Sequence, residues 1–370
     1  MKHGKIFIAA TRQNDGKTTV SLGLIHAFKK RFKRVGFIKP VGQRYIIEQG
    51  FKADEDSVLI EKVCGTRCNL KDMSPIAIEK GFTERYIKKG GFQKLAQNIK
   101  LSFDRISRHK ELVVIEGTGH AGVGSVFDLS NAKVARLLGA KVILVTSGGI
   151  GKPIDEIELN RALFEKEGVE IIGVIVNKVL QAKYDKIEKI IRLGFKRKGM
   201  DVLGVMPYVS LLSMPMIKNI LEETDIKLIS KKVGMQNRIH NILVGAMEPH
   251  DALDYIGNGT LLITPGDRED MLMTLLSAHL LKKPKKDISI SGIILTGGIV
   301  PNKKIMMLME NARIPMLLSK QHTYMAASQI HDLAIKINPE DKDKTRMAAR
   351  LVEKYVDIDA ILNKICNKGG

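Results

Sequence analysis

The sequence predicts an α/β protein with a doubly wound, mostly parallel sheet covered by helices on both faces and a second, smaller α/β domain. Short apolar runs alternate with helical spans over residues 6–207, which is the pattern of a parallel sheet. The first run, Ile6–Ala9, leads through a polar loop to Gly16-Lys17-Thr18 and a span that suits a helix. This order is typical of a phosphate-binding loop, or P-loop. A second series of short apolar runs begins near Val233.

Composition indicates a globular chain. The 370 residues suffice for two or three domains, and 44% hydrophobic with 27% charged residues favours real buried cores. No apolar run approaches the roughly 18 residues of a membrane span, and the N-terminus lacks a secretory segment, so we expect a cytoplasmic protein without membrane contact. The three cysteines, Cys64, Cys68 and Cys366, are too few for a disulfide framework and are expected to be reduced.

The formal net charge of +20 raises the question of nucleic-acid binding. The lysine and arginine runs lie near expected helix ends or in loops, and aromatic residues make up only 5% of the chain. Cations near helix C-termini also suit the helix dipole. We therefore expect solvated basic faces and no nucleic-acid partner. Binding that weakens steeply with salt would indicate the opposite.

The P-loop carries the first candidate site. Backbone N–H groups at a helix N-terminus favour an anion, Lys17 adds a point charge for the β- and γ-phosphates, and Thr18 offers a hydroxyl to Mg²⁺. The usual pattern has a glycine where this sequence has Thr11, so an incidental Gly-Lys-Thr is the alternative. The predicted nucleotide-binding residues of this segment are Thr11, Asn14, Asp15, Gly16, Lys17, Thr18 and Thr19.

Other polar residues follow later apolar runs. Lys39 ends the second run, at the sheet edge where ligands of open α/β folds bind. Glu116 ends the run Leu112–Ile115 and is placed like an acid that holds Mg²⁺ directly or through water. Asp54 opens a helical stretch, where it either suits the helix dipole or holds Mg²⁺. Asn177 and Pro207 end later runs and are predicted to contact the nucleotide.

The order of these signals resembles dethiobiotin synthetase. The matching strings are the P-loop, K-P-V from Lys39, E-G-T-G from Glu116, V-N-K at Asn177 and L-G-V-M-P-Y around Pro207. The resemblance covers about residues 1–225 and extends to the synthetase-like N-terminal domain of long phosphate acetyltransferases.

That resemblance implies ATP and Mg²⁺ as cofactors. It implies Lys17, Lys39 and Glu116 as catalytic residues, with Lys39 facing the transferred group. Thr18, Asp54 and Glu116 would be the metal ligands, and Asn177 the adenine contact. The strings after Lys39 and Glu116 depart from the synthetase where it grips its diamine substrate, so that substrate does not carry over.

The second part resembles the DRTGG domain, which follows the synthetase-like domain in long phosphate acetyltransferases. Its two motifs are G-D-R at Gly266–Arg268 and T-G-G at Thr296–Gly298. We expect a synthetase-like domain at 1–225, a linker at 226–232, a DRTGG-like ligand-sensing domain at 233–340, and a C-terminal helix and tail at 341–370. The acetyltransferase catalytic domain that follows in those enzymes is expected to be absent.

Two functions remain open from sequence. One is an enzyme that hydrolyses ATP or transfers its phosphoryl group, regulated by the DRTGG-like domain. The other is a non-catalytic adenine-nucleotide sensor that acts through a protein partner. In both cases the expected small-molecule partner is a nucleotide, and the expected assembly is a homodimer.

Overall fold

The computed structural model describes residues 4–280, 288–333 and 335–366. The chain forms two compact units, Met1–Leu212 with Ile337–Gly370 and Ser213–Lys336. The C-terminal residues, expected as a separate helix and tail, therefore belong to the first unit. Within the described ranges, none of the helices has the length and apolar character needed to cross a bilayer.

The first unit is built on a sheet of six parallel strands in the order β10-β9-β8-β1-β7-β2. This confirms the predicted doubly wound sheet. The strands are β1 (Gly4–Ala10), β2 (Val35–Ile38), β7 (Leu112–Glu116), β8 (Lys141–Ser147), β9 (Ile171–Val179) and β10 (Val202–Pro207). Their interior residues are almost all buried, as expected for strands covered on both faces.

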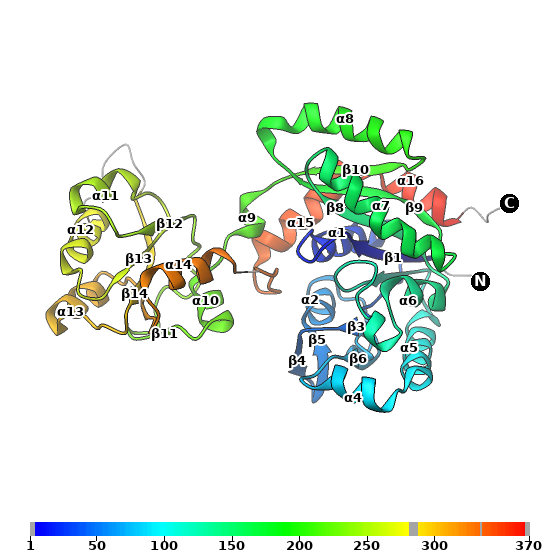
Figure 1. The fold of residues 1–370 in the computed structure, drawn as a ribbon, viewed down its shortest axis with the longest axis horizontal. Coiled ribbons are helices and arrows are strands. Elements are labelled where there is room, and N and C mark those ends of the chain that lie inside the picture. The colour runs from blue at the N-terminus through cyan, green and yellow to red at the C-terminus, as the bar shows by residue number, and fades with distance from the viewer. Residues whose placement is uncertain (1–3, 281–287, 334, 367–370) are drawn as a thin grey trace. The chain divides into compact units, whose positions relative to one another are not determined.

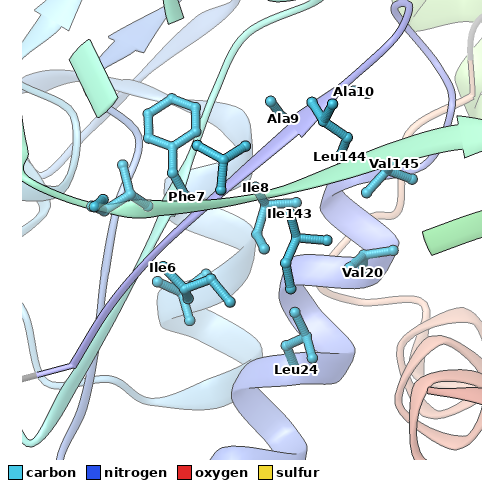
Figure 2. Close-up of a cluster of buried hydrophobic side chains, with 14 of the residues drawn as sticks. Ile6, Phe7, Ile8, Ala9, Ala10, Val20, Leu24, Ile143, Leu144 and Val145 are labelled. Atoms are coloured by element: carbon cyan, nitrogen blue, oxygen red, sulfur yellow. The ribbon is translucent and has the colours of Figure 1, made fainter. Parts of the chain in front are cut away.

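The core is densest where the first strand meets its helix. In β1, Ile6–Ala10 are fully buried between β7 and β8, and Val20 and Leu24 of α1 (Lys17–Lys29) are also inaccessible to solvent. Figure 2 shows these side chains beside Ile143 of β8. This packing fixes the direction in which α1 begins, and hence the position of the loop between them.

Two groups of helices cover this sheet (Figure 1). The connection from β1 to β2 crosses the sheet in one direction, and the successive connections β7 to β8, β8 to β9 and β9 to β10 cross it in the other direction. Right-handed crossovers therefore place the helices of these two sets of connections on opposite faces of the sheet. Against α1 pack α2 (Glu55–Cys64), α15 (Lys342–Tyr355) and α16 (Ile358–Cys366). The other group is α5 (Phe92–Ser107), α6 (Asn131–Leu138), α7 (Gly151–Lys166) and α8 (Tyr184–Arg197), each packed on the next.

Smaller elements lie between β2 and β7, between β7 and α6, and directly after β9. They are β3 (Val41–Gly42), β4 (Tyr45–Glu48), β5 (Phe51–Asp54), α3 (Leu70–Met73), β6 (Ile76–Ala77), α4 (Phe82–Lys89) and the 3-10 turns Ser125–Phe127 and Gln181–Lys183. The antiparallel hairpin of β4 and β5 delivers Asp54 to the start of α2. The sequence does not predict this hairpin, because each strand has only four residues and Tyr45–Glu48 lacks the alternation of apolar and polar residues that marks a half-buried strand.

The second unit has a five-stranded sheet in the order β11-β15-β14-β13-β12, and all its pairs are parallel except β11 with β15. Its strands are β11 (Lys227–Leu228), β12 (Asn241–Val244), β13 (Thr260–Pro265), β14 (Ile290–Thr296) and β15 (Met316–Leu318). Its helices are α10 (Ile217–Glu223), α11 (Pro249–Tyr255), α12 (Glu269–Leu280), α13 (Lys303–Asn311) and α14 (Thr323–His331), and α9 (Ser210–Ser213) spans the sequence boundary between the two units.

The predicted linker, residues 226–232, is not a free connection. It contributes β11, which pairs with β15 at the edge of the sheet, and Ile226 is buried in a core cluster. A strand at the edge of a sheet tolerates lysines on its unpaired side. The lysines of residues 226–232 therefore give this strand the composition of a linker.

Candidate active site

The P-loop takes its shape from side chains instead of the usual first glycine. The Thr11 hydroxyl lies 2.8 Å from Asp15 Oδ2, 3.1 Å from Thr146 Oγ1 and 3.1 Å from Glu156 Oε2. The N–H of Arg12 donates to the same Asp15 oxygen over 2.8 Å. Burial raises the pKa of Asp15, and these hydrogen bonds oppose the rise. Thr11 and Asp15 therefore hold the loop's conformation from its inner side.

Lys17 and Thr18 occupy the first turn of α1, directly after Gly16, whose φ is 100°. Lys17 is buried, and its Nζ lies 3.5 Å from the carbonyl oxygen of Arg12, so the side chain folds back along the loop. Burial lowers the pKa of Lys17, although nearby Glu116 opposes this. Thr19 lies in the same turn and is partly buried. An ammonium group is thus placed beside helix N–H groups, where an anion is favoured.

A buried cluster of four charges lies next to this turn. Lys39 Nζ is 3.1 Å from Asp54 Oδ1 and 3.6 Å from Glu116 Oε1, and it also contacts Asp56 Oδ2. Burial alone would lower the pKa of Lys39, but the carboxylates of Asp56, Asp54 and Glu116 hold it well above its usual value. Burial raises the pKa of Glu116 to about 7, against the opposing effect of Lys39. Lys39 is therefore a stable cation in this cluster.

Asp54 and Asp56 both contact Lys39, and Asp54 also caps the helix that it opens. Asp54 caps α2, because its side chain accepts a hydrogen bond of 2.9 Å from the N–H of Asp56. Asp56 lies two residues further along the chain and reaches Lys39. The sequence places Asp54, Glu55 and Asp56 together at the start of this helix as candidate carboxylates, and Asp54 was the one predicted as a metal ligand. The contact of Asp56 with Lys39 was not predicted.

The site fits a magnesium ion on chemical grounds. Glu116 Oε2 is buried and makes no hydrogen bond within the described part of the chain, and Glu116 Oε1 accepts from the Thr18 hydroxyl over 3.0 Å. The described residues hold no group of three or more His, Cys, Asp or Glu arranged for a metal. Mg²⁺ usually takes one or two protein carboxylates and completes its shell with phosphate and water oxygens. Thr18 and Glu116 suit that role, with Asp54 and Asp56 close to Lys39.

Asn177 lies against the P-loop itself. Its Nδ2 donates to the carbonyl oxygen of Asp15 over 2.9 Å, and the neighbouring Lys178 donates from Nζ to the carbonyl of Asn14 over 2.6 Å. Pro207 is buried at the end of β10, opposite Val179 of β9. The structure thus brings Asn177 together with the loop, and it places Pro207 within the sheet ladder.

The P-loop contacts of two further residues were not predicted from sequence. Glu156 of α7 pairs with the Arg12 guanidinium and lies near the Thr11 hydroxyl, so it ties the loop to the opposite helical layer. Lys178 was noted only as the second residue of an Asn-Lys pair at a strand end, where several nucleotide-binding folds read the base. Neither residue lies at a sequence spacing that marks a P-loop contact, so their contacts with the loop become visible only in the folded chain.

In the second unit the G-D-R and T-G-G motifs meet. A Cβ added to Gly266 would come 1.9 Å from the carbonyl oxygen of Ile299, next to the T-G-G segment. Arg268 forms an ion pair with Asp270 at 2.9 Å and approaches the carbonyls of Gly245 and Met247 at 3.4 and 3.2 Å. The described contacts therefore use Arg268 to join loops of this unit.

The T-G-G amides are also engaged within the unit. Gly297 N–H donates to the carbonyl of Gln321, and Gly298 N–H donates to that of Ser319, over 2.8 and 2.9 Å. These bonds satisfy both glycine N–H donors within the unit.

Comparison with known proteins defines the class. A family model described as "AAA domain" (AAA_26) matches residues 4–216, more than half of the chain, and the chain belongs to this family. A "DRTGG domain" model matches residues 219–333. The expected order of a P-loop domain followed by a DRTGG domain is thereby confirmed.

The curated relatives are named phosphate acetyltransferases. That of Nitratidesulfovibrio vulgaris is 25% identical over 372 residues, covering 98% of this chain and 52% of the relative. That of Synechocystis is 24% identical over 365 residues, covering 97% and 51%. The chain spans about half the length of these relatives. Since the matches run through nearly the whole chain, the expectation that the acetyltransferase domain is absent is not confirmed.

Among solved structures, the MinC:MinD complex of Aquifex aeolicus is 17% identical, with a TM-score of 0.37, over 57% of this chain and 84% of that one. The CBS and DRTGG domains of a Clostridium perfringens pyrophosphatase, complexed with diadenosine tetraphosphate, are 21% identical with a TM-score of 0.25, over 31% and 45%.

Proposed function

We propose that the first unit binds an adenine nucleotide with Mg²⁺ and hydrolyses it or transfers its terminal phosphoryl group. The observation that carries this proposal is the hydrogen bond from Thr18, in the first turn of α1, to the buried Glu116 at the end of β7. It joins the two halves of a phosphate–metal site within one unit. The family match over residues 4–216 supports the same class of activity.

Each residue has a distinct task in this proposal. Lys17 and the N–H groups at the start of α1 bind the phosphates. Thr18 and Glu116 hold the metal, with Asp54 and Asp56 as nearby carboxylates, and the metal supplies positive charge for the phosphate oxygens. Lys39, kept protonated by its three carboxylates, orients the acceptor, either water or a carboxylate or carbamate. Most of the rate enhancement then comes from positioning and preorganised charge.

The second unit is proposed to sense an adenine nucleotide and to regulate the first, in a homodimer in the cytoplasm. Because the relatives are named phosphate acetyltransferases, we propose acetyl transfer to phosphate as the activity of the whole protein. This region would be its nucleotide-responsive part. The alternative is a non-catalytic sensor that acts through a protein partner. The pairing of Lys39 with Asp54 and Asp56 favours this alternative, because these carboxylates already engage the ammonium group that the enzyme would need for its acceptor.

Calorimetric titration with ATP and Mg²⁺, followed by phosphate release on the same sample, tests these functions. Binding with Mg²⁺-dependent release is the result expected of the enzyme. Binding without release under varied acceptors would replace the enzyme by the sensor. A lack of binding would overturn both.

A further inference from the structure

Two adjacent residues at the end of β9 grip the P-loop from outside. We propose that Asn177 and Lys178 form a brace that sets the conformation of this loop, and hence its affinity for polyphosphate, and that Asn177 is not primarily a contact for the adenine base. The inference rests on the proposed nucleotide-binding function. It assigns to both residues a positioning role.

The brace consists of two hydrogen bonds to consecutive carbonyl groups. Lys178 Nζ donates to the carbonyl of Asn14 over 2.6 Å, and Asn177 Nδ2 donates to the carbonyl of Asp15 over 2.9 Å. Within the brace, the Lys178 N–H donates to Asn177 Oδ1 over 2.8 Å, which fixes the orientation of the amide. Both ends of the Asn177 amide are thus engaged, and the side chain is only 5% exposed.

The geometry of the peptide bond explains how these two hydrogen bonds would orient the N–H groups of the P-loop. In a trans peptide the carbonyl of one residue and the N–H of the next point in opposite directions. Holding the Asn14 and Asp15 carbonyls toward β9 therefore turns the N–H groups of Asp15 and Gly16 to the other side. Successive N–H groups that point into one concavity form an anion-binding nest.

Backbone conformation supports the same role. Asn14 has φ of 67° and Lys178 has φ of 60°, so non-glycine residues on both sides of one hydrogen bond adopt the uncommon left-handed conformation. Such conformations persist where surrounding contacts over-determine them. A Cβ on Gly16 would lie 2.1 Å from Asn177 Nδ2, so the loop and the amide are in direct contact.

Titration with two probes separates a brace from a base contact. Mg·ATP carries an adenine, whereas Mg·tripolyphosphate carries none. In the full chain, Asn177→Ala and Lys178→Met are each expected to weaken both probes by the same factor, roughly tenfold, which is the value of one hydrogen bond to a charged or strongly polar site. Lys183→Met removes an exposed lysine from the following turn, and it should leave both affinities unchanged.

The outcomes discriminate between the roles. A variant that weakens ATP and leaves tripolyphosphate unchanged would overturn the brace in favour of base recognition. Wild-type affinities in both variants, for both probes, would show that the contacts are incidental. If the wild type binds neither probe, the proposed function fails, and the inference with it. Lys178→Met retains the stem of a partly buried side chain, so it keeps the test decisive if Asn177→Ala does not fold.

Discussion

The Thr18 hydroxyl donates a hydrogen bond of 3.0 Å to Oε1 of Glu116, and these residues are separated by 98 positions in sequence. The bond links the first turn of α1 to the end of β7, which is a neighbour of β1 in the sheet. Glu116 is fully buried, so water screens its carboxylate little. A charged group bound beside Thr18 would therefore interact strongly with this carboxylate.

Replacing Glu116 with Gln tests whether that carboxylate serves a metal. The amide is nearly isosteric, so nucleotide binding should persist in part. Phosphate release should fall by roughly 100-fold or more, because the amide brings no charge to the metal. A phosphate-release assay measures the rate, and ATP titration with and without Mg²⁺ measures the affinity.

The control is Glu111→Gln, an exposed glutamate just before β7 whose carboxylate accepts from the Arg34 N–H. Its release rate should equal that of the wild type. Equal rates in Glu116→Gln and the wild type would remove Glu116 from the metal site.

Lys17→Ala should weaken ATP binding by roughly 100-fold, equivalent to about 2.7 kcal/mol. The Lys17 ammonium is buried at the helix N-terminus, and the neighbouring cations are engaged by carboxylates: Arg12 pairs with Glu156, and Lys39 pairs with Asp54 and Asp56. Calorimetric titration measures the change, with exposed Lys33→Ala as the matched loss of one charge. An unaltered affinity in Lys17→Ala would contradict the P-loop assignment.

The sequence predicted the first sheet well because its strands are continuous apolar runs, as β1 and β7 illustrate. It also predicted the polar residues at strand ends, since Lys39 and Glu116 end such runs directly. These two residues meet because β2 pairs with β7 in parallel, which follows from the fold class.

Other parts of the site depend on contacts that local pattern does not encode. Glu156 reaches the loop from α7, and Asp56 reaches Lys39 only because Asp54 begins the helix. The return of α15 to the first unit was missed because a helix after a second domain carries no mark of its packing partner.

Arg268→Ala should destabilise the second unit. The guanidinium joins the start of α12 to the carbonyls of Gly245 and Met247, and loss of such charged hydrogen bonds costs about 1–3 kcal/mol. Chemical denaturation followed by a probe in the second unit measures this loss, with Lys304→Ala on the exposed side of α13 as control.

Adenine nucleotides complete the Arg268 experiment. If the variant keeps its stability yet loses a thermal shift that AMP, ADP or a dinucleotide produces in the wild type, Arg268 binds ligand and its internal contacts are secondary. A ligand at about 100 times its Kd would raise stability by about 2.7 kcal/mol, well within detection.

Gly23→Ala tests the contact between the P-loop helix and the C-terminal segment. Within a helix, alanine is normally more stable than glycine by about 1 kcal/mol. Here a Cβ on Gly23 would lie 2.3 Å from Val352 Cγ2 and 2.9 Å from the carbonyl oxygen of Ala348, both in α15. Because one of those atoms is backbone, α15 must shift, and we expect destabilisation of about 1–3 kcal/mol.

A matched control and a double variant make the Gly23 test specific to packing. Gly151, at the first position of α7, has no atom within 4 Å of an added Cβ, so Gly151→Ala should be neutral or slightly stabilising. Val352→Ala removes Cγ2, the atom nearest the added Cβ at position 23, but keeps Val352 Cβ, which would lie at 2.5 Å. The double variant should therefore recover part of the loss and lose less stability than the sum of the single variants. Strictly additive losses, or a stabilised Gly23→Ala, would show that α15 does not pack on α1 as described. Denaturant titration of the wild type and these variants determines the sign, and ATP affinity measured on the same samples reports whether a displaced α15 alters the loop at the start of α1.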